Sequence, residues 1–201
     1  MKFNNENLNR FVFPKSKNDV SPGDFCYYDG SVSGNVIDCE DVIGIVAACT
    51  DTGFYVISLK EKVLSWGKFP FSLCIQSLFG KSGKCISKRL RKFANALKIK
   101  VPVLDYCENF VVRGASFRYG FMPTSAEWKL FAENLNAIKD GLDRMDAVLP
   151  VGIYWAMPTN FGIDKENACN LTLYPAQMLY QNPEEYLSVR PVLFITYYHK
   201  L

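Results

Sequence analysis

A chain of 201 residues, 49% hydrophobic and 21% charged, is long enough for one domain with a substantial core and too apolar to be disordered. A net charge of +3 favours no class of partner by itself. Basic residues gather between Lys81 and Lys100, where they indicate either the solvated face of a helix or a patch for an acidic partner. No nucleic-acid-binding module matches the sequence, so we expect no nucleic-acid partner.

The first residues carry no secretory signal, because their polar start lacks the apolar core of roughly 7–15 residues that such signals have. No later apolar run approaches the length of a membrane span. These features predict a protein that is made and folded in a cytoplasm. An odd number of cysteines without a CxxC pair argues against a disulfide framework and a zinc site, and predicts free, mostly buried thiols. The seven are Cys26, Cys39, Cys49, Cys74, Cys85, Cys107 and Cys169.

The N-terminal part of the chain is rich in strand patterns. Residues 1–20 are polar and predict an arm that orders only against something else. A strand over 25–28 is closed by the Asp29-Gly30 turn, and residues 31–41 form a polar connection. The apolar run VIGIVAAC (42–49) predicts a buried strand, and FYVISL (54–59) predicts its antiparallel partner.

Helical spacing dominates the middle of the chain. Apolar residues at steps of three and four predict a helix over 85–97, which Pro102 ends. Residues 106–112 are ambiguous, and 117–121 alternate as in a half-buried strand. Thr124 and Glu127 have the capping-box spacing, so a second helix is expected from Ser125 to Lys139 or Asp140, with Gly141 at its C′ position.

The C-terminal part returns to strand patterns. A short strand is expected at 152–155, then a long polar and aromatic section over 158–185, and finally one strand over 186–198. Pro191 inside that last strand indicates an edge or a bulge, because proline cannot donate to the ladder. We expect Trp155 and Tyr186 to be core residues that anchor strands.

The sequence offers little catalytic chemistry. Its only histidine, His199, lies near the C-terminus, so a Ser-His-Asp or Cys-His site has no plausible base. The resemblance of 79–82 to a phosphate loop fails because Ile75 stands where a glycine is needed. We therefore expect no catalytic residues, no metal site and no cofactor.

Tyrosines among polar residues instead favour a binding role, because such loops combine large contact area with adaptable hydrogen bonding. The candidates either display a binding surface or pack as ordinary loop residues. They are Asn160, Phe161, Asp164, Lys165, Tyr174 and Tyr180.

Several short motifs recur here in a characteristic order. They are YYDG (27–30), IGIV (43–46), FYVISL (54–59), Trp66-Gly67, YGFMPTSAEW (119–128), GIYW (152–155) and YLSVRPVL (186–193). In this order the chain resembles the C-type-lectin-like domains abundant in gut Bacteroidetes and their phages. The resemblance covers about residues 22–197 and implies an α+β fold with a mixed, mostly antiparallel sheet and two helices. It divides the chain into an N-terminal arm (1–20) and a C-type-lectin-like domain (21–201).

The resemblance also implies roles for particular residues. Trp128, Trp155, Arg190 and Pro191 would be framework, and the 156–185 section would be the displayed face. The chain departs from the family at Ala156-Met157-Pro158, where a small polar run is usual. It also lacks the Glu-Pro-Asn or Gln-Pro-Asp triplet and the Trp-Asn-Asp of calcium-dependent sugar binding. The formylglycine-generating enzymes share the fold but use a cysteine pair where this chain has only Cys169.

These features predict a non-catalytic binding or structural module. Without a signal peptide, we expect a phage virion fibre, decoration protein or adhesin that recognises a host cell-surface protein or glycan. Its arm would attach it to other virion proteins or to its own copies, in a trimer by analogy with fibres. The alternatives are a bacterial surface adhesin, a purely structural capsid or tail component, and a copper-dependent enzyme of the formylglycine-generating type that uses Cys169.

Overall fold

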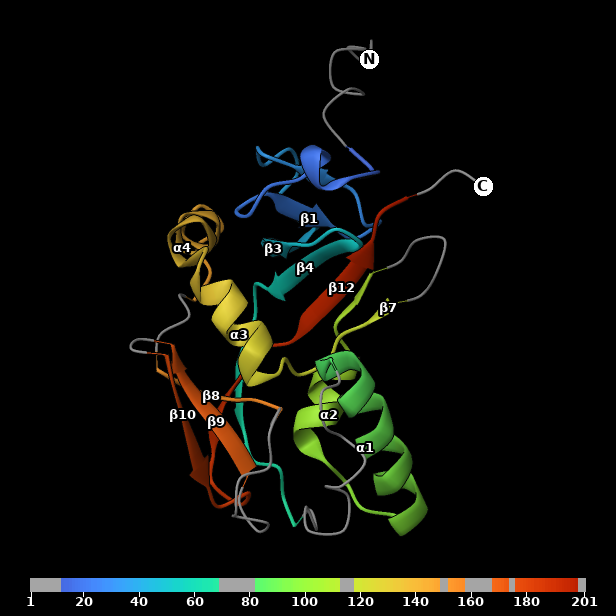
Figure 1. The fold of residues 1–201 in the computed structure, drawn as a ribbon, viewed down its shortest axis with the longest axis vertical. Helices are drawn as coiled ribbons and strands as arrows, with labels where there is room; N and C mark the ends of the chain where they lie inside the picture. Colours follow the sequence, from blue (N-terminus) through green and yellow to red (C-terminus); the bar gives the residue numbers. More distant parts are fainter. Residues whose placement is uncertain are drawn as a thin grey trace.

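The computed structural model describes residues 12–68, 82–112, 118–148, 152–157, 168–173 and 176–198, with only the backbone at 118, 168–173 and 176–181. The described chain is α+β, with four α-helices and strands that pair almost entirely antiparallel, so the predicted class is confirmed at this level. The strands form two five-stranded sheets and a two-stranded ribbon, where one mixed sheet was expected. Figure 1 shows β1, β3, β4 and β12 of the first sheet in the upper part of the view, above α1 and α2.

The first sheet is antiparallel throughout and has the strand order β12-β4-β3-β1-β2. The predicted pair of apolar runs forms its centre, because strands with nearly continuous apolar sequence are buried on both faces. A hairpin turn at Asp29-Gly30 joins the first two strands, as predicted. The strands are β1 (Phe25–Tyr27), β2 (Val32–Ser33), β3 (Val42–Cys49), β4 (Gly53–Ser58) and β12 (Val192–Thr196).

The second sheet has the order β10-β9-β8-β11-β5. Among its described strands, β8 and β11 form the one parallel pair, in which Ser188 lies opposite Tyr154. The hairpin of β9 and β10 lies in the lower part of the view, on the opposite side from α1 (Figure 1). The strands are β5 (Lys62–Leu64), β8 (Ile153–Trp155), β9 (Ala168–Leu173), β10 (Ala176–Gln181) and β11 (Leu187–Val189).

The prediction of one final strand over 186–198 was wrong. Two short strands, β11 and β12, lie there in different sheets, and Arg190-Pro191 is the crossing between them. Pro191 is therefore neither an edge residue nor a bulge in a continuous strand, and its carbonyl accepts a hydrogen bond from the Ser58 amide at 3.0 Å. Tyr186, predicted as a core residue, lies just before β11 and is 69% exposed.

Helix α1 (Gly83–Leu97) confirms the predicted helix and begins two residues earlier, after the Ser82 N-cap. Pro102, predicted to end this element, instead opens α2 (Pro102–Glu108), because proline's fixed φ and missing N–H suit the first helical turn. After α2 the chain forms the ribbon of β6 (Val111–Val112) and β7 (Arg118–Tyr119), which replaces the longer strand expected over 117–121.

The second predicted helix is two helices, α3 (Ser125–Ala132) and α4 (Leu135–Asp143). The break lies at Asn134, whose side-chain amide donates to the Ala47 carbonyl of β3 at 3.2 Å. Gly141 is inside α4 and not at a C′ position. Glycine fits there because a Cβ would lie only 2.9 Å from the Ile45 side chain. The capping box at Thr124 and Glu127 is confirmed at the start of α3.

Part of the predicted arm lies against the first sheet. Val12 pairs with Val32, Val20 is buried, and the Tyr198 amide donates to the Pro14 carbonyl at 2.8 Å. A short 3-10 helix, η2 (Lys17–Asp19), lies between them. The rest of the arm, 1–11, is outside the described residues.

Candidate functional site

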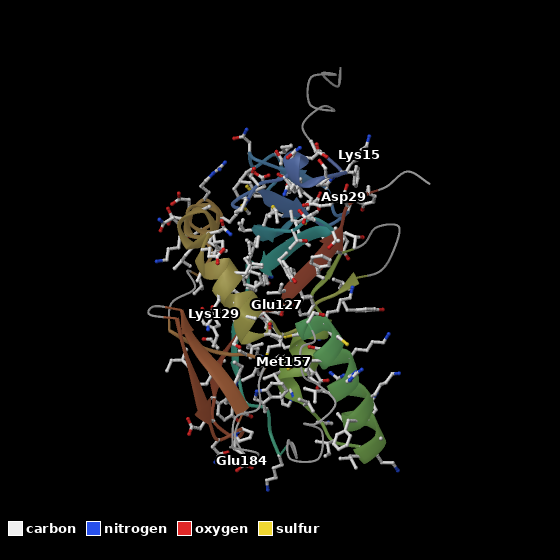
Figure 2. All side chains as sticks on the ribbon, viewed as in Figure 1. Lys15, Asp29, Glu127, Lys129, Met157 and Glu184 are labelled. Atoms are coloured by element: carbon white, nitrogen blue, oxygen red, sulfur yellow. The ribbon has the colours of Figure 1, made fainter. Side chains whose placement is uncertain are left out.

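The 156–185 section connects β8 to β11, two neighbouring parallel strands, and it includes β9 and β10 of the same sheet. Just after β8 the chain is held against the start of α3. The Met157 amide donates to the Pro123 carbonyl at 2.8 Å, and the Ser125 amide donates to the Met157 carbonyl at 3.2 Å. Figure 2 places Met157 in the interior below Glu127. Both ends of the section are therefore fixed on the same sheet.

A buried ion pair lies at this base. The Arg190 side chain is fully buried, and its guanidinium donates to Glu61 Oε2 at 2.6 and 3.1 Å. It also donates to the carbonyls of Ser58 and Val148, at 3.1 and 2.6 Å. A buried cation is tolerated only when its donors are satisfied. Through these hydrogen bonds Arg190, which follows β11, contacts the end of β4, the segment after it and the segment before β8.

Tyr154 completes the same network. Its hydroxyl donates to Glu61 Oε2 at 2.6 Å. Burial raises the pKa of Tyr154, and the hydrogen bond to Glu61 adds to that rise, so the hydroxyl stays a donor. Since Tyr154 is on β8 and Arg190 follows β11, Glu61 connects the two strands that bracket the 156–185 section.

The predicted framework residues are placed as follows. Trp155 is buried, as expected, and its indole N–H donates to the Leu64 carbonyl at 2.7 Å. Trp128 is buried, with its ring centroid 5.1 Å from Tyr154 and 5.6 Å from Phe131. Together with Arg190 and Pro191 these residues surround the junction between the two sheets and α3.

The predicted ligand-binding residues fall almost entirely outside the described part of the chain. Asn160, Phe161, Asp164, Lys165 and Tyr174 are not described. Tyr180 lies in β10 opposite Cys169 of β9, with only its backbone described. The set of binding residues therefore stays a prediction.

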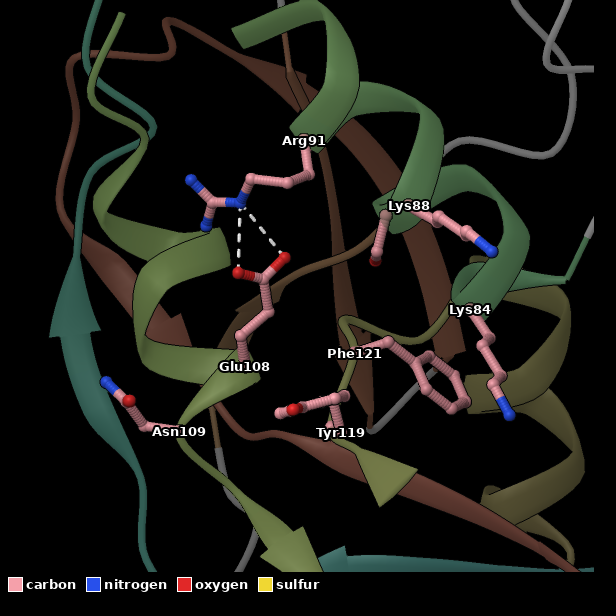
Figure 3. Close-up of a pocket in the computed structure, with 9 residues that line it drawn as sticks. Lys84, Lys88, Arg91, Glu108, Asn109, Tyr119 and Phe121 are labelled. Atoms are coloured by element: carbon pink, nitrogen blue, oxygen red, sulfur yellow. Dashed lines mark hydrogen bonds and ion pairs between the residues drawn. The ribbon is translucent and has the colours of Figure 1, made fainter. Parts of the chain in front are cut away.

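A cavity of about 650 Å³ lies elsewhere, between α1, the end of α2 and β7 (Figure 3). One face of α1 forms a wall, with side chains at i, i+3, i+4 and i+7. The lining residues are Lys84, Ser87, Lys88 and Arg91 of α1, Glu108-Asn109, and Tyr119 to Phe121. Sequence reasoning located the basic run but not this cavity, because the residues opposite come from α2 and β7.

The charges in the cavity wall are unequally paired. Arg91 lies 2.9 Å from Glu108 and 2.7 Å from Asp105. Burial lowers the pKa of Arg91, but the hydrogen bonds and charges of Glu108 and Asp105 outweigh that effect and the net shift is upward. Lys88 is exposed, and no acidic partner for it occurs in the described part of the chain. The wall thus contains both a neutralised and an open cation.

Other chemistry has less support among the described residues. Cys26 and Cys107 are fully buried free thiols, and burial raises the pKa of both, which makes them poor nucleophiles. Cys39 is exposed, whereas Cys49 and Cys85 are half-buried, and the side chains of Cys74 and Cys169 lie outside the described part of the chain. No group of three or more potential metal-ligating side chains occurs in the described ranges. None of the described helices is long and apolar enough to span a membrane.

No protein-family model, no curated protein and no solved structure matches this chain.

Proposed function

We propose that this protein is a non-catalytic binding module of the C-type-lectin-like kind, which displays the 156–185 section to a cell-surface protein or glycan. The observation that supports this proposal is the anchoring of both ends of that section. They leave from adjacent parallel strands, β8 and β11, which the Glu61–Arg190–Tyr154 network joins. Binding loops need such a rigid base, because flexibility at the base would add to the entropy lost on binding.

Burial of polar groups stabilises the base of the section. The Arg190 guanidinium and the Trp155 indole both donate to backbone carbonyls in the interior. Moving either end of the section would leave these polar groups unpaired in a low-dielectric environment, which costs several kcal/mol for a charged group, on the order of 3–5. The base is thereby held in one arrangement whatever the loops contact.

For the biological setting we propose a phage virion component, such as a fibre, decoration protein or adhesin. Its partners would be other virion proteins or its own copies, in a trimer, with attachment through the N-terminal arm. A bacterial surface adhesin and a purely structural capsid or tail protein are the competing settings. The first of these is distinguished by the native upstream sequence and the second by the binding experiment below.

The experiment measures binding of the purified protein to intact gut Bacteroidetes cells. A triple variant, Phe161→Ala, Tyr174→Ala and Tyr180→Ala, is compared with the wild type after both are shown to fold. The matched control replaces three exposed apolar residues outside the section, Val63→Ala, Leu97→Ala and Tyr186→Ala.

We expect the wild type and the control to bind and the triple variant to lose at least tenfold in affinity. If neither protein binds, or if the triple variant binds as well as the wild type, the receptor proposal is wrong and a structural role is favoured. Light scattering of the same samples tests the trimer.

A further inference from the structure

Helix α1 and the residues that follow it carry a surface of unpaired positive charge. The helix contains five basic residues and no acidic one, so no pair of opposite charges within it can neutralise them. Lys84 and Arg89 have partners of their own, and the unpaired charge does not come from them. Four further lysines are exposed and form no ion pair within the described part of the chain. This basic surface consists of Lys88, Lys92, Lys98 and Lys100.

The carboxylates of α2 do not remove this charge. Asp105 and Glu108 are both held by Arg91, at 2.7 and 2.9 Å. The four lysines and Arg91 against these two carboxylates leave three positive charges (four plus one minus two). Like charges on neighbouring side chains repel one another, so an acidic partner from another molecule would stabilise the surface.

The end of α4 carries the opposite charge. Asp140 and Asp143 lie in its last turn, where the helix dipole disfavours carboxylates and no basic residue is present. The segment 38–41 adds to this charge, because the residues before it lie beside α4, where the Arg144 guanidinium donates to the Gly34 carbonyl at 3.4 Å. All the carboxylate residues of this acidic surface are exposed, and they are Asp38, Glu40, Asp41, Asp140, Asp143 and Asp146.

The two cations nearby leave most of the acidic surface unpaired. Arg144 lies over the Phe25 ring, 4.6 Å from its centroid, and Lys139 forms no ion pair within the described ranges. Even with both counted, four negative charges remain (six minus two). No group among the described residues could hold a metal ion. The acidic surface therefore suits the cationic side chains of a protein.

The two surfaces lie on opposite sides of the molecule and match in spacing. Figure 1 shows α1 at the lower right and α4 at the upper left, so one copy cannot bring them together. Lys88 and Lys92 are separated by a rise of about 6 Å along α1, and Asp140 and Asp143 by about 4.5 Å along α4. Two such helices lying side by side can form both ion pairs at once, since long lysine side chains bridge the difference.

We propose that the basic surface at α1 of one copy binds the acidic surface at α4 of a second copy, head to tail. Such a contact joins two different surfaces, so its repetition closes a ring or extends a row of copies. It is separate from the N-terminal arm and from the 156–185 section, and it does not depend on the function proposed for them. Because the charges are exposed, salt screens the contact strongly.

Sedimentation equilibrium of the full chain at two salt concentrations tests the proposal. Between about 0.01 M and 1 M NaCl the screening length decreases from about 30 Å to about 3 Å. We expect the average mass to rise with protein concentration in low salt and to fall in high salt. A trimer held by the backbone hydrogen bonds of the arm would keep its mass in both, so the two contacts are measured separately. If the masses in low and high salt are equal up to about 1 mM protein, the proposal is wrong.

Charge reversal locates the contact. The α1 variant Lys88→Glu, Lys92→Glu and the α4 variant Asp140→Lys, Asp143→Lys each place like charges opposite one another, so each alone should associate at least tenfold more weakly in low salt. An equimolar mixture of the two should associate again, because the reversed surfaces are complementary to each other.

The control variant, Lys15→Glu with Lys62→Glu, changes two exposed lysines outside both surfaces. It has the same net charge as the α1 variant, −1 (three minus four), and should associate as the wild type does. A mixture that fails to associate, or a control as weak as the α1 variant, would overturn the assignment of the contact to these two surfaces.

Discussion

Two largely buried carboxylates, Glu127 and Glu61, are satisfied in different ways. Glu127 accepts from the Thr124 amide at 2.7 Å and from the Thr124 hydroxyl at 3.0 Å, both three residues away. Glu61 accepts from Arg190, which is 129 residues away, and from Tyr154, 93 residues away. The first arrangement follows from a four-residue pattern, whereas the second exists only when the two sheets have come together.

The two sites also differ in charge. Glu127 has neutral donors, including the Gly83 amide at 3.1 Å and the Tyr55 hydroxyl at 3.4 Å. Burial raises the pKa of Glu127, although the hydrogen bonds from Thr124 and Gly83 oppose the rise. Glu61 instead faces the buried Arg190 guanidinium. The comparison indicates that local hydrogen bonds position a helix, while a long-range ion pair fixes how the sheets join.

Replacing the cation should have the largest effect. Arg190→Met leaves Glu61 without its counter-charge and two carbonyls without a donor, so we expect a loss of about 3–5 kcal/mol in the free energy of unfolding, measured by urea denaturation. The double variant Glu61→Gln, Arg190→Met should be more stable than Arg190→Met alone. A loss below about 1 kcal/mol in the single variant would show that the ion pair does not hold the junction.

The contact between α1 and the capping box is tested by Gly83→Ala. Alanine normally stabilises a helix by about 1 kcal/mol over glycine. Here its Cβ would meet the Met122 carbonyl oxygen and lie 2.7 Å from Glu127 Oε2, so we expect a net loss of about 1–3 kcal/mol. As control, Ala96→Gly at an exposed position of α1 should cost about 1 kcal/mol. Stabilisation by Gly83→Ala would contradict the close packing.

The pH dependence of stability in the variant Glu127→Gln distinguishes the effect of the Glu127 charge from the effect of its hydrogen bonds. Because the folded-state pKa of Glu127 is raised above its ordinary 4.5, its contribution to stability is largest at low pH and decreases as pH rises through that folded-state value. Glutamine keeps a capping acceptor and does not ionise. The stability of the variant relative to wild type should therefore increase above about pH 4.5 and then level off. At neutral pH the two proteins should differ in the free energy of unfolding by no more than about 1–2 kcal/mol. A difference that is flat across pH would contradict the raised pKa.

The smallest effect is expected at the surface. Lys17 lies 3.1 Å from Asp51, but the two side chains are 60% and 89% exposed. Lys17→Ala should change the free energy of unfolding by less than about 0.5 kcal/mol, because solvent and salt screen such a pair. Thermal and urea denaturation both measure this change in the free energy of unfolding. A loss comparable to that of Arg190→Met would mean that burial is not what distinguishes the two ion pairs.

The elements predicted correctly share one property, which is that their information lies within a few neighbouring residues. The two central strands of the first sheet, the helix α1 and the Thr124–Glu127 capping box all appear where expected. An apolar run, helical spacing or capping-box spacing defines each of them, and their ends coincide with turns or caps. Their apolar faces were identified because hydrophobic burial needs no particular partner.

Several of the incorrect predictions involve a partner far along the chain. One helix was expected where α3 and α4 lie, because the apolar steps continue past Asn134. The break coincides with the hydrogen bond from the Asn134 side chain to Ala47 in β3. One strand was expected over 186–198, because the apolar run is unbroken apart from Arg190-Pro191. The cavity beside α1 was missed for the same reason, as Glu108 and Tyr119 join it through tertiary packing.

By itself the sequence determined the α+β class, the central antiparallel strands, the start of α3 and the presence of a basic helix, since periodicity and capping act over one to four residues. Tertiary structure alone decided that the last apolar run divides between two sheets and that Arg190 binds Glu61. It also decided that the basic face of α1 borders a cavity. The physical reason is that a buried charge and an enclosed space depend on which distant segments meet, and no local pattern records that meeting.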